Sequence, residues 1–176
     1  MQPATQGIIA AAADFLWSAE LATAACDAIH NKPEGPMEEH VKDPAVFLVE
    51  YADGLKTATL MLSGYVSDFS YAARVDGQVQ GVEFYLQNEG PFSHFGYLCR
   101  NVQDFFRTKK APYPPERTLL TTGIIDAAMN SRHEDHRKIE TPYLNVAYSS
   151  YDKLPQRPIG TRPAGASIDP QAPDII

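Results

Sequence analysis

Two Asp-Gly pairs constrain the fold of this chain more than any other feature, because each lies between two short runs of β-forming residues. Glycine readily adopts the positive φ that a tight hairpin turn requires. Asp53-Gly54 and Asp76-Gly77 therefore each predict a β-hairpin. These pairs and the polar segment between them separate four such runs, at residues 46–51, 55–62, 69–75 and 79–86.

The run 69–75 alternates in the manner of a strand with one buried face. One set of alternate positions is apolar: Phe69, Tyr71, Ala73 and Val75. The residues between them are smaller or more polar: Ser70, Ala72 and Arg74. Antiparallel sheets with one solvated face show such a pattern. We therefore expect the four runs to form an antiparallel meander.

Helical patterns flank this β-rich region on both sides. Apolar residues recur at helical spacing over residues 8–29 and, after Ser93, which can cap a helix, over residues 95–106. A third helix is predicted over residues 116–132, because Pro115 suits a first helical turn and much of the segment's circumference is apolar. We expect the second helix to pack on the sheet and the third to be buried.

The third helix contains Gly123, which costs about 1 kcal/mol relative to alanine inside a helix. Close packing against another backbone would compensate for that cost. A last strand is predicted over residues 143–148, after Pro142. Residues 152–176 are rich in Pro, Gly and Ala, so we expect an extended or disordered tail after a single domain over residues 1–151.

Composition excludes several classes of function. The formal net charge of -7 argues against a nucleic-acid partner, which needs clustered Lys and Arg. Cys26 and Cys99 lie far apart without metal-ligand spacing, so they predict neither a disulfide scaffold nor a zinc site. The apolar run 8–13 is far shorter than a membrane span and has no basic flank before it. A cytoplasmic location without membrane contact is the default expectation.

Four phrases occur in an order that resembles a known family. They are KDPAVFLVEYADGL at residues 42–55, PFSHF at 91–95, ERTLLTTG at 116–123 and IETP at 139–142. Over residues 8–148 the chain resembles the C-terminal domain of the glucose-fructose oxidoreductase, inositol dehydrogenase and MocA family. The resemblance implies an α+β fold, with a mainly antiparallel open sheet and helices packed on one face. It also implies that this sheet contacts a sugar or polyol substrate and packs subunits together.

The chain departs from the family in the parts that carry redox chemistry. It has no strand followed by Gly-x-Gly-x-x-Gly, no Glu-Lys-Pro segment and no Asp-x-x-x-His pair. Asp27-Ala28-Ile29-His30 comes nearest to that pair but is one residue too short. The resemblance thus implies NAD(P) for a full-length relative, while we assign no cofactor and no catalytic residue to this chain. Whether it belongs to an enzyme stays open.

Three residues are candidates for substrate binding. His94 could reach a polyol hydroxyl, because imidazole donates and accepts near neutral pH, or it could fix the start of a helix. Glu116 and Arg117 could bind a sugar or an acid through a carboxylate and a forked guanidinium. Alternatively they provide helix-start electrostatics and an ion pair between elements.

The segment His133-Glu134-Asp135-His136 offers metal-ligand atom types but lacks the spacing of the zinc-protease motif, so we interpret it as a solvated charge run. The aromatic residues of the sheet form either the core or an exposed face for another subunit: Phe69, Tyr71, Phe84 and Tyr85. We expect a homo-oligomer that associates through this sheet face.

Two functions compete. The first is a substrate-binding and oligomerisation domain of an NAD(P)-dependent sugar or polyol oxidoreductase-like protein, not catalytically competent alone. The second is a stand-alone, non-catalytic binding or protein-interaction module of the same fold.

Overall fold

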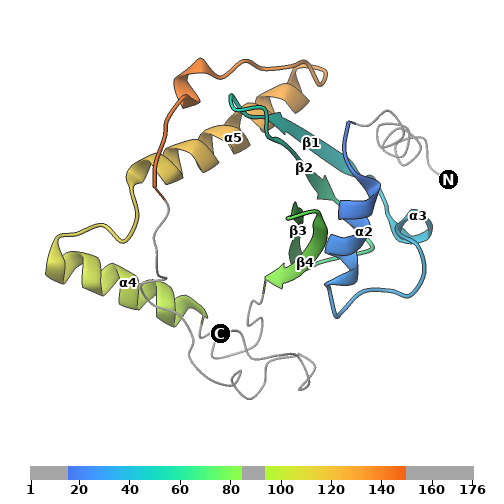
Figure 1. Ribbon diagram of the computed structural model, residues 1–176, viewed down its shortest axis with the longest axis horizontal. Helices are drawn as coiled ribbons and strands as arrows, with labels where there is room; N and C mark the ends of the chain where they lie inside the picture. The colour runs from blue at the N-terminus through green and yellow to red at the C-terminus, as the bar shows by residue number, and fades with distance from the viewer. Residues whose placement is uncertain (1–15, 85–93, 150–176) are drawn as a thin grey trace. The chain divides into compact units, whose positions relative to one another are not determined.

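The computed structural model describes residues 16–84 and 94–149 (Figure 1). The chain divides into two compact units, Met1–Tyr85 and Leu86–Ile176. The first holds α2 (Ala19–Asp27), α3 (Met37–His40), β1 (Ala45–Glu50), β2 (Lys56–Met61), β3 (Phe69–Val75) and β4 (Gln78–Phe84). The second holds α4 (His94–Thr108), α5 (Pro115–His133) and the 3-10 turn η1 (Pro142–Leu144). The class is α+β, and in the described ranges no helix is long and apolar enough to cross a bilayer.

Both predicted hairpins are present. β1 pairs antiparallel with β2, and β3 pairs antiparallel with β4. The first turn is held by Asp53, whose carboxylate oxygen accepts a hydrogen bond from the backbone N–H of Leu55 at 3.0 Å, and Gly54 has φ +88°. In the second turn Asp76 and Gly77 both have positive φ, 50° and 79°. Two such residues in succession are the requirement of the tight hairpin turn that the sequence predicted.

The predicted meander is wrong at one connection. In the part of the chain that the structure describes, the two hairpins are separate two-stranded sheets, and β2 does not pair with β3. Between them the backbone N–H groups of Tyr65 and Val66 both donate to the carbonyl oxygen of Leu62. Leu62 and Tyr65 are buried in the core with Cys26 and Val41. Burial of these side chains turns the chain out of the strand direction, so it cannot continue into a third paired strand.

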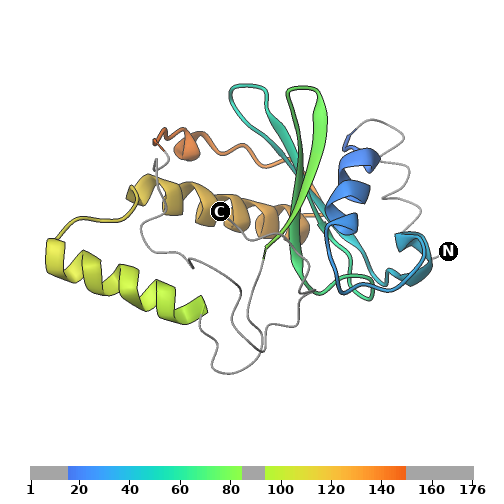
Figure 2. The same cartoon turned by 60° about the horizontal axis from the view of Figure 1, so that its bottom comes forward.

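Helix α2 packs against the β3–β4 hairpin, as the two views of Figures 1 and 2 agree. The contact centres on Gly81 of β4. A Cβ atom at this position would overlap the carbonyl oxygen of Ala24 and lie 3.4 Å from the Cβ of Ala28. The absence of a side chain at Gly81 therefore lets the backbone of the helix approach the strand.

The sequence left open which face of β3 is covered, and the structure places α2 on the face with the smaller residues. The face toward α2 contains Ala72, the cross-strand partner of Gly81, and Ser70, the partner of Glu83. The large apolar side chains lie on the other face and are exposed, with Phe69 at 61% and Tyr71 at 55%. Close packing of α2 on the hairpin needs small residues where the helix crosses the strands. The helix therefore packs on the face with the smaller residues and not on the more apolar face.

The first predicted helix begins later than expected. Ser18 caps α2, because its hydroxyl accepts a hydrogen bond from the backbone N–H of Leu21 at 3.2 Å. Such a cap defines the first helical residue as Ala19, and the bend at residues 16 and 17 excludes one continuous helix through them. The predicted portion over residues 8–15 lies outside the described residues, as do Ser93, Tyr85 and the predicted tail over residues 152–176.

In the second unit the predicted bounds of α5 are confirmed to within one residue at each end, with Pro115 in the first turn. Gly123 is closely packed, but the predicted backbone neighbour is wrong, because the neighbour is the buried side chain of Leu144. The expected burial of α5 is wrong, because none of its residues is buried and Ile125 is 64% exposed.

The last predicted strand, over residues 143–148, is also wrong. The segment forms η1 and then continues without regular structure through residue 149. The N–H of Leu144 donates to the carbonyl of Thr141 at 2.9 Å, and that of Asn145 donates to the carbonyl of Pro142 at 3.3 Å. These local bonds use the donors that a strand would direct at a neighbour, and they place Leu144 against Gly123.

Helix α4 confirms the second predicted helix. Its apolar stripe is exposed at five positions: Phe95, Leu98, Val102, Phe105 and Phe106. Packing of this stripe on the sheet remains a prediction.

Candidate functional site

The three predicted substrate-binding residues lie at helix starts. His94 is the first residue of α4, and its side chain falls outside the described part of the chain. Glu116 and Arg117 occupy the first turn of α5 and are half-buried. The guanidinium carbon of Arg117 lies 4.9 Å from the centroid of the Tyr113 ring, in a cation–π contact. Glu116 places a negative charge at the positive end of the helix.

A second group of polar side chains gathers at the C-terminal end of α2. It combines a phenol, an ammonium, two imidazoles and two carboxylates from four separate segments of the chain. We call it the α2-end cluster, and its members are Asp27, His30, Lys32, His40, Tyr65 and Glu83.

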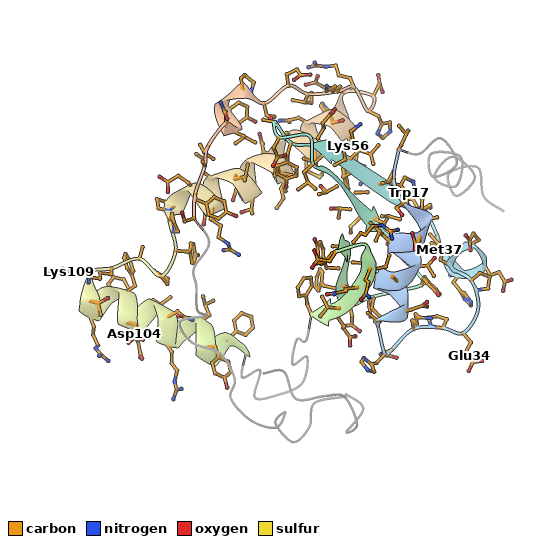
Figure 3. All side chains as sticks on the ribbon, viewed as in Figure 1. Trp17, Glu34, Met37, Lys56, Asp104 and Lys109 are labelled. Carbon is orange, nitrogen blue, oxygen red and sulfur yellow. The ribbon has the colours of Figure 1, made fainter. Side chains whose placement is uncertain are left out.

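Tyr65 is the centre of one half of this cluster. Its ring is buried and stacks on the imidazole of His40, with 5.6 Å between centroids and 18° between planes. Its hydroxyl donates to the carbonyl oxygen of Gly35 at 3.0 Å. The Nε2 of His40 lies 2.7 Å from the carbonyl oxygen of Glu34, so this nitrogen carries the proton and donates. These bonds hold the connection between α2 and α3 against Tyr65; Figure 3 labels Glu34 on this connection and Met37 at the start of α3.

Lys32 joins the phenol to the end of the helix. Its ammonium donates to the hydroxyl of Tyr65 at 3.4 Å and lies 3.7 Å from a carboxylate oxygen of Asp27. The hydrogen bond with Tyr65 is the main cause that raises the pKa of Lys32 above its ordinary value, and the charge of Asp27 acts in the same direction. Lys32 is therefore a fixed cation at neutral pH.

His30 and Glu83 form the other half of the cluster. His30 follows the end of α2, and Glu83 lies on β4, on the face toward the helix. The Nδ1 of His30 is 2.6 Å from a carboxylate oxygen of Glu83. An ionised carboxylate only accepts hydrogen bonds, so Nδ1 carries the proton and donates. This arrangement leaves Nε2 as the acceptor nitrogen of the neutral ring.

Cys26 lies beneath the cluster, in the core formed with Val41, Leu62 and Tyr65. Burial is the main cause that raises the pKa of its thiol, the charge of Asp27 adds to the rise, and that of Lys32 opposes it. The thiolate is the reactive form of cysteine, and a buried thiol with a raised pKa is inert. Cys99, on α4, is exposed.

We expect the two cysteines to differ in alkylation by iodoacetamide. In the folded protein Cys99 is modified readily, whereas Cys26 is modified at least about 100-fold more slowly, because burial both blocks access and disfavours the thiolate. Peptide mass spectrometry over a time course measures both rates. In a strong denaturant the two rates should converge. Equal rates without denaturant would contradict the burial of Cys26.

The α2-end cluster offers several hydrogen-bond donors and acceptors that are held by one another, which suits recognition of hydroxyl groups. It does not gather a metal-ligand set. Among the described residues no group of three His, Cys, Asp or Glu side chains could hold a metal ion, and this includes the segment 133–136.

Sequence reasoning missed this cluster because its members are far apart along the chain. His30 and Glu83 are separated by 53 residues. The segment from Asp27 to His30 carries no local signal for a contact with a strand, and nothing in the strand pattern of 79–86 distinguishes Glu83 from an ordinary solvent-facing residue. Only the packing of α2 on β4 brings the two side chains together.

No protein-family model matches the chain, and neither the curated proteins nor the solved structures contain a match to it.

Proposed function

We propose that this chain is the substrate-binding and oligomerisation domain of a cytoplasmic oxidoreductase-like protein for a sugar or polyol, in which NAD(P) is carried by another domain. One observation carries the proposal. The β3–β4 hairpin has a helix packed on one face and an open, apolar opposite face. The resemblance in the sequence implies the same two-sided arrangement, with helices on one side of an antiparallel sheet and a subunit on the other.

The open face of the hairpin has the composition of an interface core. None of its eight residues carries a charge: Phe69, Tyr71, Ala73, Val75, Gln78, Gln80, Val82 and Phe84. An aromatic side chain has on the order of 150–250 Å² to bury, and more than half of each of the three aromatic side chains here is exposed. Depletion of charge with enrichment of aromatic residues is typical of the buried centre of a subunit contact. This composition supports homo-oligomerisation through the face.

Substrate binding is proposed for His94, Glu116 and Arg117, on the resemblance of their phrases to family segments. Imidazole, carboxylate and guanidinium groups together supply the donors and acceptors that a polyhydroxylated ligand requires. The second candidate function, a stand-alone binding module, keeps the sheet and its interface but binds neither polyol nor cofactor. The absence of a Gly-x-Gly-x-x-Gly phrase in the sequence favours neither function over the other, because both leave the cofactor outside this chain.

Ligand binding distinguishes the two functions. We expect myo-inositol or glucitol to bind the purified chain saturably in saturation-transfer NMR. Arg117→Ala should weaken that binding about 10-fold or more, since one charge-assisted hydrogen bond contributes ~1.5–3 kcal/mol. Arg107→Ala is the matched control, because Arg107 is an exposed arginine on α4 paired with Asp104. Unchanged binding in the Arg117 variant would remove this residue from the site.

NADH fluorescence provides the complementary measurement. We expect no saturable change when NADH is titrated with the chain, because the glycine-rich turn that cradles a dinucleotide is missing from the sequence. Saturable NADH binding would contradict a cofactor site on a separate domain. Absence of any polyol binding would leave the stand-alone interaction module as the function.

A further inference from the structure

The ion pair of His30 with Glu83 has a more buried carboxylate than the other ion pairs in the described part of this unit. The side chain of Glu83 is 14% exposed, whereas that of His30 is 43% exposed. The carboxylates of Asp27, Glu50 and Glu20, which pair with Lys32, Lys56 and Arg74, are each more than half exposed. The carboxylate is thus enclosed at the junction of α2 and β4, and the imidazole bonded to it extends toward solvent.

The backbone around this contact is fixed by packing. Gly81 lies two residues before Glu83 on β4, and it receives the carbonyl of Ala24 and the methyl group of Ala28. His30 follows Ala28 by two residues, with Ile29 buried between them. The same close approach of strand and helix therefore sets the distance between the carboxylate and the imidazole.

The chemistry of the pair follows from its geometry. Glu83 accepts from Nδ1 at 2.6 Å, which fixes the proton on that nitrogen and the plane of the ring. Nε2 of the neutral ring is then an acceptor, on a side chain that is 43% exposed. A histidine oriented by a carboxylate in this way is suited to accept a hydrogen bond, or a proton, from a hydroxyl group. Two residues further along the chain, Lys32 adds a cationic donor at the same helix end.

We propose that His30 and Glu83 form a hydroxyl-binding dyad, in which Nε2 of His30 accepts a hydrogen bond from a ligand hydroxyl and Glu83 holds the ring in the required tautomer. The ligand class is a polyol, and this part of the inference rests on the function proposed above. His30 contacts the ligand, and Glu83 is a positioning residue. The dyad lies within the first unit, whereas His94, Glu116 and Arg117 belong to the second.

Imidazole nitrogen spectra of the protein with and without myo-inositol test both halves of the proposal. In mildly alkaline buffer, two-bond ¹⁵N–¹H correlations should show His30 with its proton on Nδ1. In Glu83→Gln the preference for this tautomer should be lost, because a neutral amide accepts more weakly than a carboxylate. Addition of myo-inositol should shift the Nε2 signal of His30 saturably. Glu83→Gln should weaken this binding about 10-fold, and His30→Ala should weaken it by at least as much.

Glu20→Gln is the matched control. Glu20 pairs with Arg74 at the other end of α2, so this substitution removes one ion pair between the helix and the hairpin but leaves the dyad intact. It should change neither the tautomer of His30 nor the affinity for myo-inositol. An equal loss of affinity in Glu20→Gln would show that general loosening of α2, and not the dyad, accounts for the effect.

The outcomes separate the two proposals. If myo-inositol binds the chain while the ring nitrogens of His30 do not move, the dyad is overturned and the proposed function stands. If His30 carries its proton on Nε2 in the unmodified protein, the positioning role of Glu83 is overturned. If myo-inositol does not bind the chain at all, the proposed substrate class fails and the ligand of the dyad fails with it.

Discussion

Tyr71→Lys is expected to abolish the self-association that we propose for the open face of the β3–β4 hairpin. Tyr71 lies at the centre of the uncharged face of the β3–β4 hairpin, opposite Val82 in the strand register. In a two-fold contact the same surface faces itself, so each substitution introduces two buried cations without partners. The desolvation of these charges, together with lost aromatic burial, should weaken association at least about 100-fold, or ~2.7 kcal/mol.

Sedimentation velocity over a series of protein concentrations measures this effect. The control is Thr57→Lys, which adds the same charge at an exposed strand position of the other hairpin. It should leave association unchanged. Far-ultraviolet circular dichroism checks that both variants keep the secondary structure of the unmodified chain. A chain that is monomeric at every concentration before substitution would contradict the proposed interface.

Gly81→Ala is expected to destabilise the first unit by about 3 kcal/mol, at the upper end of the usual cost of overpacking. The new methyl group would overlap the carbonyl oxygen of Ala24, and a backbone atom cannot move aside as a flexible side chain can. The helix must therefore shift away from the hairpin. That shift would strain the ion pairs of Glu20 with Arg74 and of His30 with Glu83.

Urea denaturation followed by circular dichroism measures the loss in the free energy of unfolding. Gly96→Ala is the matched control, because a Cβ at this position of α4 meets nothing within 4 Å. It should be neutral or stabilise by up to ~1 kcal/mol through helix propensity. The Gly81 variant should also expose Cys26 to iodoacetamide, since this cysteine lies on the same helix. A Gly81 variant as stable as the unmodified chain would mean that α2 does not rest on β4 at this point.

Local chemistry predicted the elements whose limits depend on a few neighbouring residues. Asp-Gly pairs predicted both hairpins, because positive φ is a property of the turn residues themselves. Pro115 predicted the start of α5, and the cost of Gly123 within a helix predicted a close neighbour there. For the two hairpins and the start of α5, the signal and the structure lie within a few positions of one another in the chain, whereas the neighbour of Gly123 is the more distant Leu144.

The sequence pattern did not predict the features that depend on tertiary packing. The alternation along β3 indicated two faces but could not say which one a helix would cover, because that depends on Gly81 in the partner strand. The apolar content of residues 143–148 suggested a strand, yet Leu144 is buried in a 3-10 turn. The α2-end cluster likewise depends on packing between residues tens of positions apart.

The close packing of α2 on Gly81 restricts how the helix can move along β4. Because the backbone carbonyl of Ala24 occupies the space of a side chain at Gly81, the helix cannot slide along the strand by two residues without a clash between Ala24 and the side chain of Val79 or Glu83, which lie on the same face of β4. Ion pairs anchor the region at both ends. Helix and hairpin therefore form one packed substructure, and a displacement of α2 along the strand would strain both ion pairs at once.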